Sequence, residues 1–104
     1  MIKSYVYVLR SLKDQRWYIG QTSLLPEERL KQHNAGQVES TKNRRQLELI
    51  YYEMYLDKDD AFGREKFLKG GSGHTFLKKQ LKNFLGVKSS AAPQIRLKSV
   101  GGGT

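Results

Sequence analysis

The chain has 104 residues, no cysteine and a formal net charge of +9. This length fits one small domain with a single core, and the lack of cysteine excludes disulfides and cysteine-bound zinc. No apolar run approaches the roughly 20 residues that span a bilayer, and the N-terminus lacks the apolar segment of a signal peptide. We therefore expect a soluble, cytoplasmic protein that makes no membrane contact.

The positive charge is concentrated in one part of the sequence. All ten acidic residues lie at or before Glu65, and every charged residue after it is basic. Such a surface attracts polyanions, most often nucleic acid, although a merely solvated basic surface would show the same composition.

Two short apolar runs near the N-terminus are predicted to be β-strands. Ser4–Arg10 and Trp17–Gly20 are rich in the β-branched and aromatic residues that suit a half-buried pleated surface. The polar stretch 11–16 between them has the length of a hairpin loop. Tyr7 and Tyr18 are therefore expected on neighbouring strands.

Residues 24–36 carry the start and stop signals of a short helix. Pro26 suits the first helical position, two glutamates follow it, and Gly36 can adopt the left-handed conformation that ends a helix. Arg29 and His33 are then one turn apart, on one face of this helix.

The segment from residue 37 to 55 begins with a polar, basic loop and continues as a strand. Residues 37–46 are predicted to form a surface loop that contacts phosphates or serves only as a connector. Leu47–Tyr55 has apolar residues in both registers, so we predict a strand in the centre of the sheet, covered on both faces.

Two further helices and a tail complete the predicted fold. Asp57 or Asp59 can cap a second helix that ends at Lys69, and Gly63 within it indicates either a weaker helix or close packing. Ser72 can cap a third helix with an apolar stripe of Leu77, Leu81, Phe84 and Leu85. Residues 1–86 would form the domain, and residues 87–104 a basic, disordered tail. The predicted fold class is α/β (α+β), a small, largely antiparallel three-stranded sheet flanked by three helices.

Five features occur in a specific order along the chain. They are Tyr5-Val6-Tyr7, Tyr18-Ile19-Gly20, Arg29, His33, and Glu65 within Gly63-Arg64-Glu65-Lys66-Phe67-Leu68. In these features the sequence resembles the GIY-YIG endonuclease superfamily over residues 2 to about 85, in particular its small stand-alone bacterial branch. It is more distantly similar to homing endonucleases and to the incision domain of the excision-repair nuclease. It departs from the usual pattern at Tyr5, where the superfamily has glycine.

The resemblance implies a divalent-metal-dependent DNA endonuclease, with DNA repair or recombination as its setting. It implies that Tyr7 contacts or deprotonates the attacking water, and that Tyr18 and His33 position the phosphate or share the proton transfer. Independently of the family, Arg29 can grip a phosphate bidentately, and Glu65 offers hard oxygen ligands suited to Mg²⁺ or Mn²⁺.

Basic side chains outside this group are predicted to contact the nucleic-acid backbone. They are Arg10, Lys42, Arg44, Arg45, Lys69, Lys78, Lys79 and Lys82. DNA is the expected partner, and RNA and a protein partner are left open. A non-catalytic nucleic-acid-binding module on the same fold, or an RNA-directed protein, would fit the charge equally well.

Overall fold

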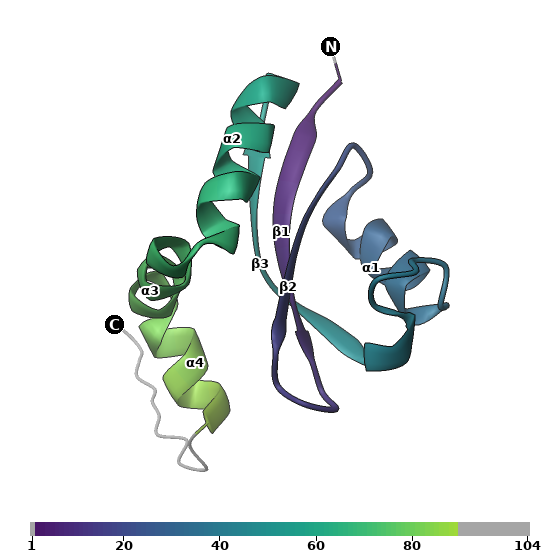
Figure 1. Cartoon of the computed structure of the whole chain (residues 1–104), viewed down its shortest axis with the longest axis vertical. Helices are drawn as coiled ribbons and strands as arrows, with labels where there is room; N and C mark the ends of the chain where they lie inside the picture. Colours follow the sequence, from purple (N-terminus) through teal and green to yellow (C-terminus); the bar gives the residue numbers. More distant parts are fainter. Residues whose placement is uncertain (1, 90–104) are drawn as a thin grey trace, which may run out of the picture. The chain divides into compact units, whose positions relative to one another are not determined.

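The computed structural model describes residues 2–89 of the chain (Figure 1). In chain order the elements are β1 (Ser4–Ser11), β2 (Trp17–Thr22), α1 (Pro26–Asn34), a short 3₁₀ turn (Lys42–Arg44), β3 (Leu47–Tyr55), α2 (Lys58–Lys69), α3 (Gly71–Gln80) and α4 (Lys82–Ser89). None of the helices in this described range is long and apolar enough to cross a membrane.

Contacts divide the chain into two compact units, one ending at Gly70 and the other beginning at Gly71. This division falls inside the domain predicted over residues 1–86. The predicted tail, 87–104, is described only as far as Ser89, the last residue of α4. The rest of it lies outside the described residues.

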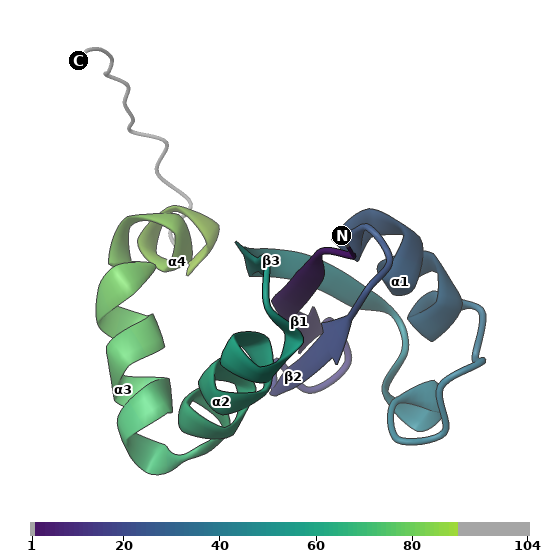
Figure 2. The ribbon, with the colours of Figure 1, turned by 90° about the horizontal axis from the view of Figure 1, so that it is seen from above.

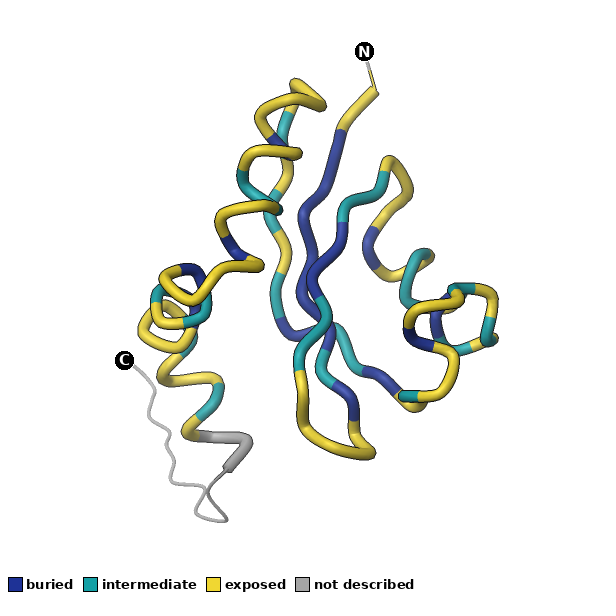
Figure 3. The backbone as a smooth tube through the Cα atoms, viewed as in Figure 1, coloured by how far each residue is buried: buried dark blue, intermediate teal, exposed yellow. Residues whose placement is uncertain are grey.

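The sheet is three-stranded and antiparallel, with the strand order β2-β1-β3. The prediction that residues 47–55 form the central strand is therefore wrong, because β1 is central. The reason is visible in the burial (Figure 3): every residue of β1 from Ser4 to Leu9 is buried, whereas β3 leaves Tyr52 and Met54 nearly half exposed. A continuous apolar run did not distinguish a doubly covered strand from an edge strand with aromatic residues on its outer side.

The two faces of the sheet are covered by different helices (Figures 1 and 2). On the α1 face, Tyr7, Leu9 and Leu47 form a buried cluster. On the α2 face, the guanidinium of Arg64 pairs with the carboxylate of Glu53 at 2.9 Å. Because both faces are covered, side chains from α1 and from α2 approach the hairpin from opposite sides.

The first helix ends as its sequence predicts. Gly36 has φ = 80°, its N–H donates to the carbonyl of His33, and the N–H of Gln37 donates to the carbonyl of Gln32. These two bonds form the left-handed glycine cap that closes many helices. Asn34, at the last helical position, then exchanges two side-chain hydrogen bonds with the backbone of Leu47, at 2.9 and 2.8 Å. The end of α1 thereby fixes the start of β3.

The second helix begins at a side-chain cap. The carboxylate of Asp57 accepts the N–H of Asp59 at 2.7 Å, so Asp57, of the two predicted candidates, is the cap. Ala61 and Leu68 are the buried residues of α2. A Cβ on Gly63 would meet no atom within 4 Å, so close packing does not explain this glycine.

The third predicted helix is two helices in the structure. α3 ends at Gln80 and α4 begins at Lys82, so residues 2–89 contain four α-helices where three were expected. Of the predicted apolar stripe, Leu77 is fully buried and Phe84 is 37% exposed. The stripe continues through both helices with one periodicity, which is why the pattern did not reveal the break.

Candidate active site

The Tyr7 hydroxyl lies at the centre of a buried polar cluster between β1 and α1. It is 2.8 Å from Nε2 of His33 and accepts the Nε–H of Arg29 at 3.3 Å. Tyr7 is 1% exposed and His33 is fully buried. Arg29 and His33 reach the same hydroxyl because they are one turn apart on α1. The structure thus brings together three of the residues that the sequence singled out.

Thr41 completes a chain of hydrogen bonds behind His33. Its Oγ1 lies 2.6 Å from Nδ1 of His33, and the residue is fully buried. Because an arginine N–H can only donate, the Tyr7 oxygen accepts from Arg29, and the Tyr7 hydroxyl proton can pass to Nε2 of His33. Nδ1–H of His33 then donates to Thr41. With His33 neutral, both of its ring nitrogens and the Tyr7 hydroxyl have hydrogen-bond partners.

The electrostatics of the cluster keep it uncharged apart from Arg29. Burial raises the pKa of Tyr7 to about 12, against the opposing hydrogen bond from Arg29. Burial, followed by the positive charge of Arg29, lowers the pKa of His33 to about 4. At neutral pH both side chains are therefore neutral. The nearby cation alone does not convert Tyr7 into a phenolate base.

The low pKa of His33 makes folding stability depend on pH. Between pH 6.5 and about 4 the unfolded chain binds a proton at this histidine and the folded chain does not. Stability should therefore fall as the pH is lowered through this window, by on the order of 3 kcal/mol from this residue. We expect urea titrations across the window to show a flatter pH dependence for His33→Gln than for the wild type. If stability changes equally with pH in the two proteins, His33 is not the source of the pH dependence.

Gly20 on β2 provides the space that the Tyr7 hydroxyl occupies. Tyr7 and Gly20 are cross-strand partners, and a Cβ at Gly20 would lie 2.5 Å from the Tyr7 hydroxyl oxygen and 3.0 Å from Cε2 of Tyr18. Any side chain there would displace both tyrosine rings. The glycine of the Tyr18-Ile19-Gly20 motif is thus explained by packing around the hydroxyl.

We expect Gly20→Ala to destabilise the fold by about 1–3 kcal/mol, as overpacking of a dense site does. Gly63→Ala is the matched control: an added Cβ meets nothing there, so it should stabilise α2 by about 1 kcal/mol. Thermal melts of the two variants test this prediction. Equal melting temperatures would contradict the role of Gly20 in leaving space for the Tyr7 hydroxyl.

Tyr18 and Arg29 offer hydrogen-bonding groups that have no partner among residues 2–89. The Tyr18 ring is half-buried, with centroids 6.3 Å from Tyr7 and 5.1 Å from His33. Its hydroxyl bonds to no other described residue. Nη1 of Arg29 donates to Gln32 at 2.7 Å, and Nη2 has no partner within residues 2–89. These two groups can donate to a bound anion.

Glu65 approaches from α2 on the other side of the hairpin. Its negative charge contributes to the raised pKa of Tyr7, so it acts electrostatically on the cluster. The Glu65 side chain is 15% exposed, and its Oε2 is 2.9 Å from Nζ of Lys69. Its Oε1 has no partner in the described part of the chain. Residues 2–89 contain no group of three or more acidic, histidine or cysteine side chains that could hold a metal.

The predicted backbone-binding cations differ in exposure and in their contacts. Arg10 pairs with Glu48 at 2.9 Å, and Arg44 donates to the carbonyl of Trp17 at 3.2 Å. Lys69 pairs with Glu65, as described above, Lys42 pairs with Glu39 at 3.3 Å, and Arg45 donates to the carbonyl of Lys42 at 2.8 Å. The exposed residues of the set are Lys42, Arg45, Lys69, Lys78, Lys79 and Lys82. The phosphate contacts of the whole set stay a prediction, and the engaged residues would have to exchange partners to make them.

Two contributors to the cluster were not identified from the sequence. Thr41 lies in the polar stretch predicted as a surface loop, yet it is fully buried against His33. Gln32 holds Arg29 from the same helix. The spacing of 29 and 32 on one helix could have indicated Gln32, whereas only the fold shows that Thr41 returns to the site.

Comparison with known proteins places this chain in a family. The family model described as the GIY-YIG catalytic domain matches residues 3–80. The chain is 40% identical over 79 residues to the UPF0213 protein SH2523 of Staphylococcus haemolyticus, covering 75% of this chain and 94% of that protein. It is 39% identical over 67 residues to the UPF0213 protein CPE1444 of Clostridium perfringens, covering 64% of this chain and 70% of that protein.

A solved structure also matches. The solution NMR structure of the UPF0213 protein BH0048 from Bacillus halodurans has 30% sequence identity and a TM-score of 0.46, covering 79% of this chain and 84% of that one. The match to the family model spans both tyrosine motifs, the α1 arginine and histidine, and Glu65 on α2. The chain belongs to the GIY-YIG catalytic domain family, a family of nucleases.

Proposed function

We propose that the chain is a divalent-metal-dependent DNA endonuclease that hydrolyses phosphodiester bonds, acting in DNA repair or recombination in the cytoplasm. The observation that carries the proposal is that His33 and Arg29 both bond to the Tyr7 hydroxyl. The negative charge of Glu65 also acts on this hydroxyl. Nη2 of Arg29 and the Tyr18 hydroxyl, which bond to no residue in the described range, support the proposal because both could donate to a bound phosphate.

The residues present fit a Mg²⁺ or Mn²⁺ ion held mainly by water and substrate. Glu65 presents one carboxylate oxygen that has no partner among the described residues, and Mg²⁺ commonly takes one or two carboxylates beside phosphate oxygens. When bound, the metal would stabilise negative charge on the phosphate and promote deprotonation of water. In this proposal Glu65 is the single protein ligand, and Lys69 would exchange its Glu65 contact for a phosphate.

The buried chain of hydrogen bonds from Tyr7 through His33 to Thr41 supports a proton relay in which no Tyr7 phenolate accumulates. The Tyr7 oxygen would take a proton from the attacking water while the Tyr7 hydroxyl proton passes to Nε2 of His33, so that His33 ends as the cation. A bound phosphodiester would offset the charge of Arg29, one of the two causes that lower the pKa of His33. Substrate binding would thereby make His33 a better proton acceptor.

The role of Thr41 in this relay can be tested with two matched variants. Thr41→Val keeps the shape but removes the acceptor for Nδ1–H of His33, so we expect the single-turnover rate to fall about tenfold or more. Thr41→Ser keeps the hydroxyl and should retain most of the rate. Circular dichroism and thermal melts would verify that both variants are folded. If the serine variant loses as much as the valine variant, the hydroxyl is not what matters.

The non-catalytic and RNA-directed alternatives remain outcomes of the same experiment. Purified chain is incubated with supercoiled, nicked, branched and single-stranded DNA, with RNA beside them, in Mg²⁺, Mn²⁺ or EDTA. The proposal expects DNA cleavage that requires metal. Salt-sensitive binding without cleavage of any substrate would favour a binding module. Cleavage of RNA but not of DNA would favour the RNA-directed alternative.

A further inference from the structure

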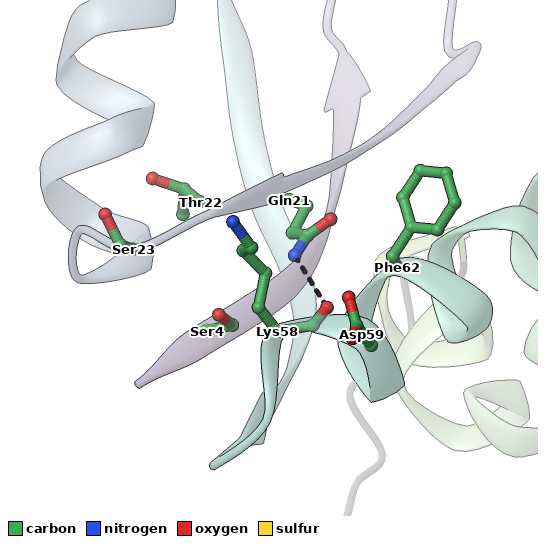
Figure 4. A pocket seen from close by; sticks show the side chains of 7 residues that line it. All are labelled: Ser4, Gln21, Thr22, Ser23, Lys58, Asp59 and Phe62. Atoms are coloured by element: carbon green, nitrogen blue, oxygen red, sulfur yellow. Dashed lines mark hydrogen bonds between the residues drawn. The ribbon is translucent and has the colours of Figure 1, made fainter. Parts of the chain in front are cut away.

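A separate pocket lies where β1 begins, β2 ends and α2 starts (Figure 4). Its volume is about 390 Å³, in the range of small-ligand sites. Its walls carry Ser4, Gln21, Thr22, Lys58, Asp59 and Phe62. None of these residues belongs to the cluster around the Tyr7 hydroxyl. We propose that the pocket receives an unpaired nucleobase of the substrate strand near the cleavage site, an inference that rests on the proposed nuclease function.

Ser4 indicates that the pocket takes a polar ligand. The residue is 4% exposed, it lines the pocket, and its hydroxyl makes no hydrogen bond to any other described residue. Buried hydroxyls almost always have a partner. A ligand that fills the pocket would supply the missing donor or acceptor.

The charges in the pocket favour a base over a phosphate. Lys58 offers an ammonium group, but Asp59 places a carboxylate beside it, and Asp57 already accepts the N–H of Asp59 at 2.7 Å. A phosphate would be repelled by these carboxylates, whereas amino and ring N–H groups of a base can donate to Asp59. Gln21 donates its amide to the Lys58 carbonyl at 3.3 Å, which orients its oxygen as a further acceptor (Figure 4).

Phe62 supplies an aromatic surface at the edge of the pocket. The residue is 53% exposed, and Nζ of Lys66 lies 5.4 Å from its ring centroid. Exposed aromatic rings of this kind stack on unpaired bases, whatever the base identity. A cation beside the ring can at the same time approach the nucleic-acid backbone.

The position of the pocket along α2 relates it to the cleavage site. Phe62 lies three residues before Glu65, and Asp59 lies six residues before Glu65. These separations correspond to about 4.5 Å and about 9 Å along a helix axis. Nucleotides follow one another at about 3.4 Å along a duplex strand. A base in the pocket would therefore lie about one to three nucleotides from the phosphate at Glu65. Because a base must leave the stack to enter a pocket, strands with unpaired bases beside the cut are the substrate class.

Amide chemical shifts of the full chain test the pocket without requiring cleavage. Deoxynucleoside 5′-monophosphates and deoxyribose 5-phosphate are titrated separately in EDTA. We expect the nucleotides to shift the amides of Ser4, Gln21 and Asp59, and deoxyribose 5-phosphate to leave them unchanged. Equal shifts from both ligands would show a phosphate site, and shifts confined to other residues would show that bases bind elsewhere. Either result overturns the proposal.

Variants on the same helix give a second, quantitative test. Affinity for a short single-stranded oligonucleotide is measured in EDTA by fluorescence anisotropy. Phe62→Ala should weaken binding about tenfold and Asp59→Asn several-fold. The matched controls, Phe67→Ala and Asp60→Asn, change residues of α2 that do not line the pocket. Losses in the controls as large as in the test variants would overturn the proposal.

Ser4→Ala separates ligand binding from folding. If the hydroxyl is unpaired in the free protein, its removal should leave the melting temperature unchanged or raise it, while base affinity falls. A lower melting temperature with unchanged affinity would contradict the proposal. The pocket and the nuclease function can also fail separately: cleavage without shifts at the pocket rejects only the pocket, and shifts without cleavage of any nucleic acid reject only the nuclease function.

Discussion

Replacing Glu65 with glutamine should abolish metal-dependent cleavage while the protein stays folded and still binds DNA. The substitution keeps the volume and removes the charge that a divalent cation requires. Glu65 is not a core residue, and its carboxylate forms an ion pair with Lys69 on the next turn of α2. Partly exposed pairs of this kind contribute little to stability. We therefore expect a loss of at least 100-fold in single-turnover rate with a melting temperature near that of the wild type.

Glu28→Gln is the control for this variant. Glu28 is an exposed acid in the first turn of α1, and its replacement removes the same charge outside the site. Its cleavage rate should match that of the wild type. If Glu65→Gln also cleaves at the wild-type rate, Glu65 is not a metal ligand.

Replacing Tyr7 with phenylalanine should lower the single-turnover rate by about 100-fold or more, the usual scale for losing a group that transfers a proton. The ring would still pack, but the hydroxyl that bonds to His33 and Arg29 would be lost. The structure also predicts a cost in stability of about 1–3 kcal/mol, because buried donors and acceptors lose their partner. Rates must therefore be compared well below the melting temperature of the variant.

Tyr52→Phe provides a matched control on the same sheet. Tyr52 is the β3 partner of Tyr7 in the strand register, and it is 47% exposed. Its loss of a hydroxyl should alter neither rate nor stability appreciably. A wild-type rate for Tyr7→Phe would reduce Tyr7 to a packing residue and remove the proton relay.

The sequence predicted the local elements well because their signals are local. The two strands of the hairpin, the proline start and glycine end of α1, and the Asp57 cap of α2 all follow from residues close together in the chain. Family-motif spacing likewise singled out Tyr7, Arg29 and His33, which the structure brings together at the Tyr7 hydroxyl.

What could not be predicted depends on packing between distant segments. The predicted central position of β3 was wrong because the hydrophobicity of this strand gave no information on which strand is covered on both faces. The burial of Thr41 follows from the return of the 37–46 segment to α1, and no residue pattern within that segment marks it. The ion pair of Arg10 with Glu48 similarly joins positions 38 residues apart.

Metal-dependent cleavage at the site of Tyr7 and Glu65 can be tested by single-turnover cleavage of end-labelled branched DNA. The wild type and Glu65→Gln are purified identically and compared in Mg²⁺ and in EDTA. We expect cleavage by the wild type in Mg²⁺ alone and none by the variant in either condition. Equal cleavage by both proteins, or none by the wild type under salt conditions where it binds the DNA, would contradict it.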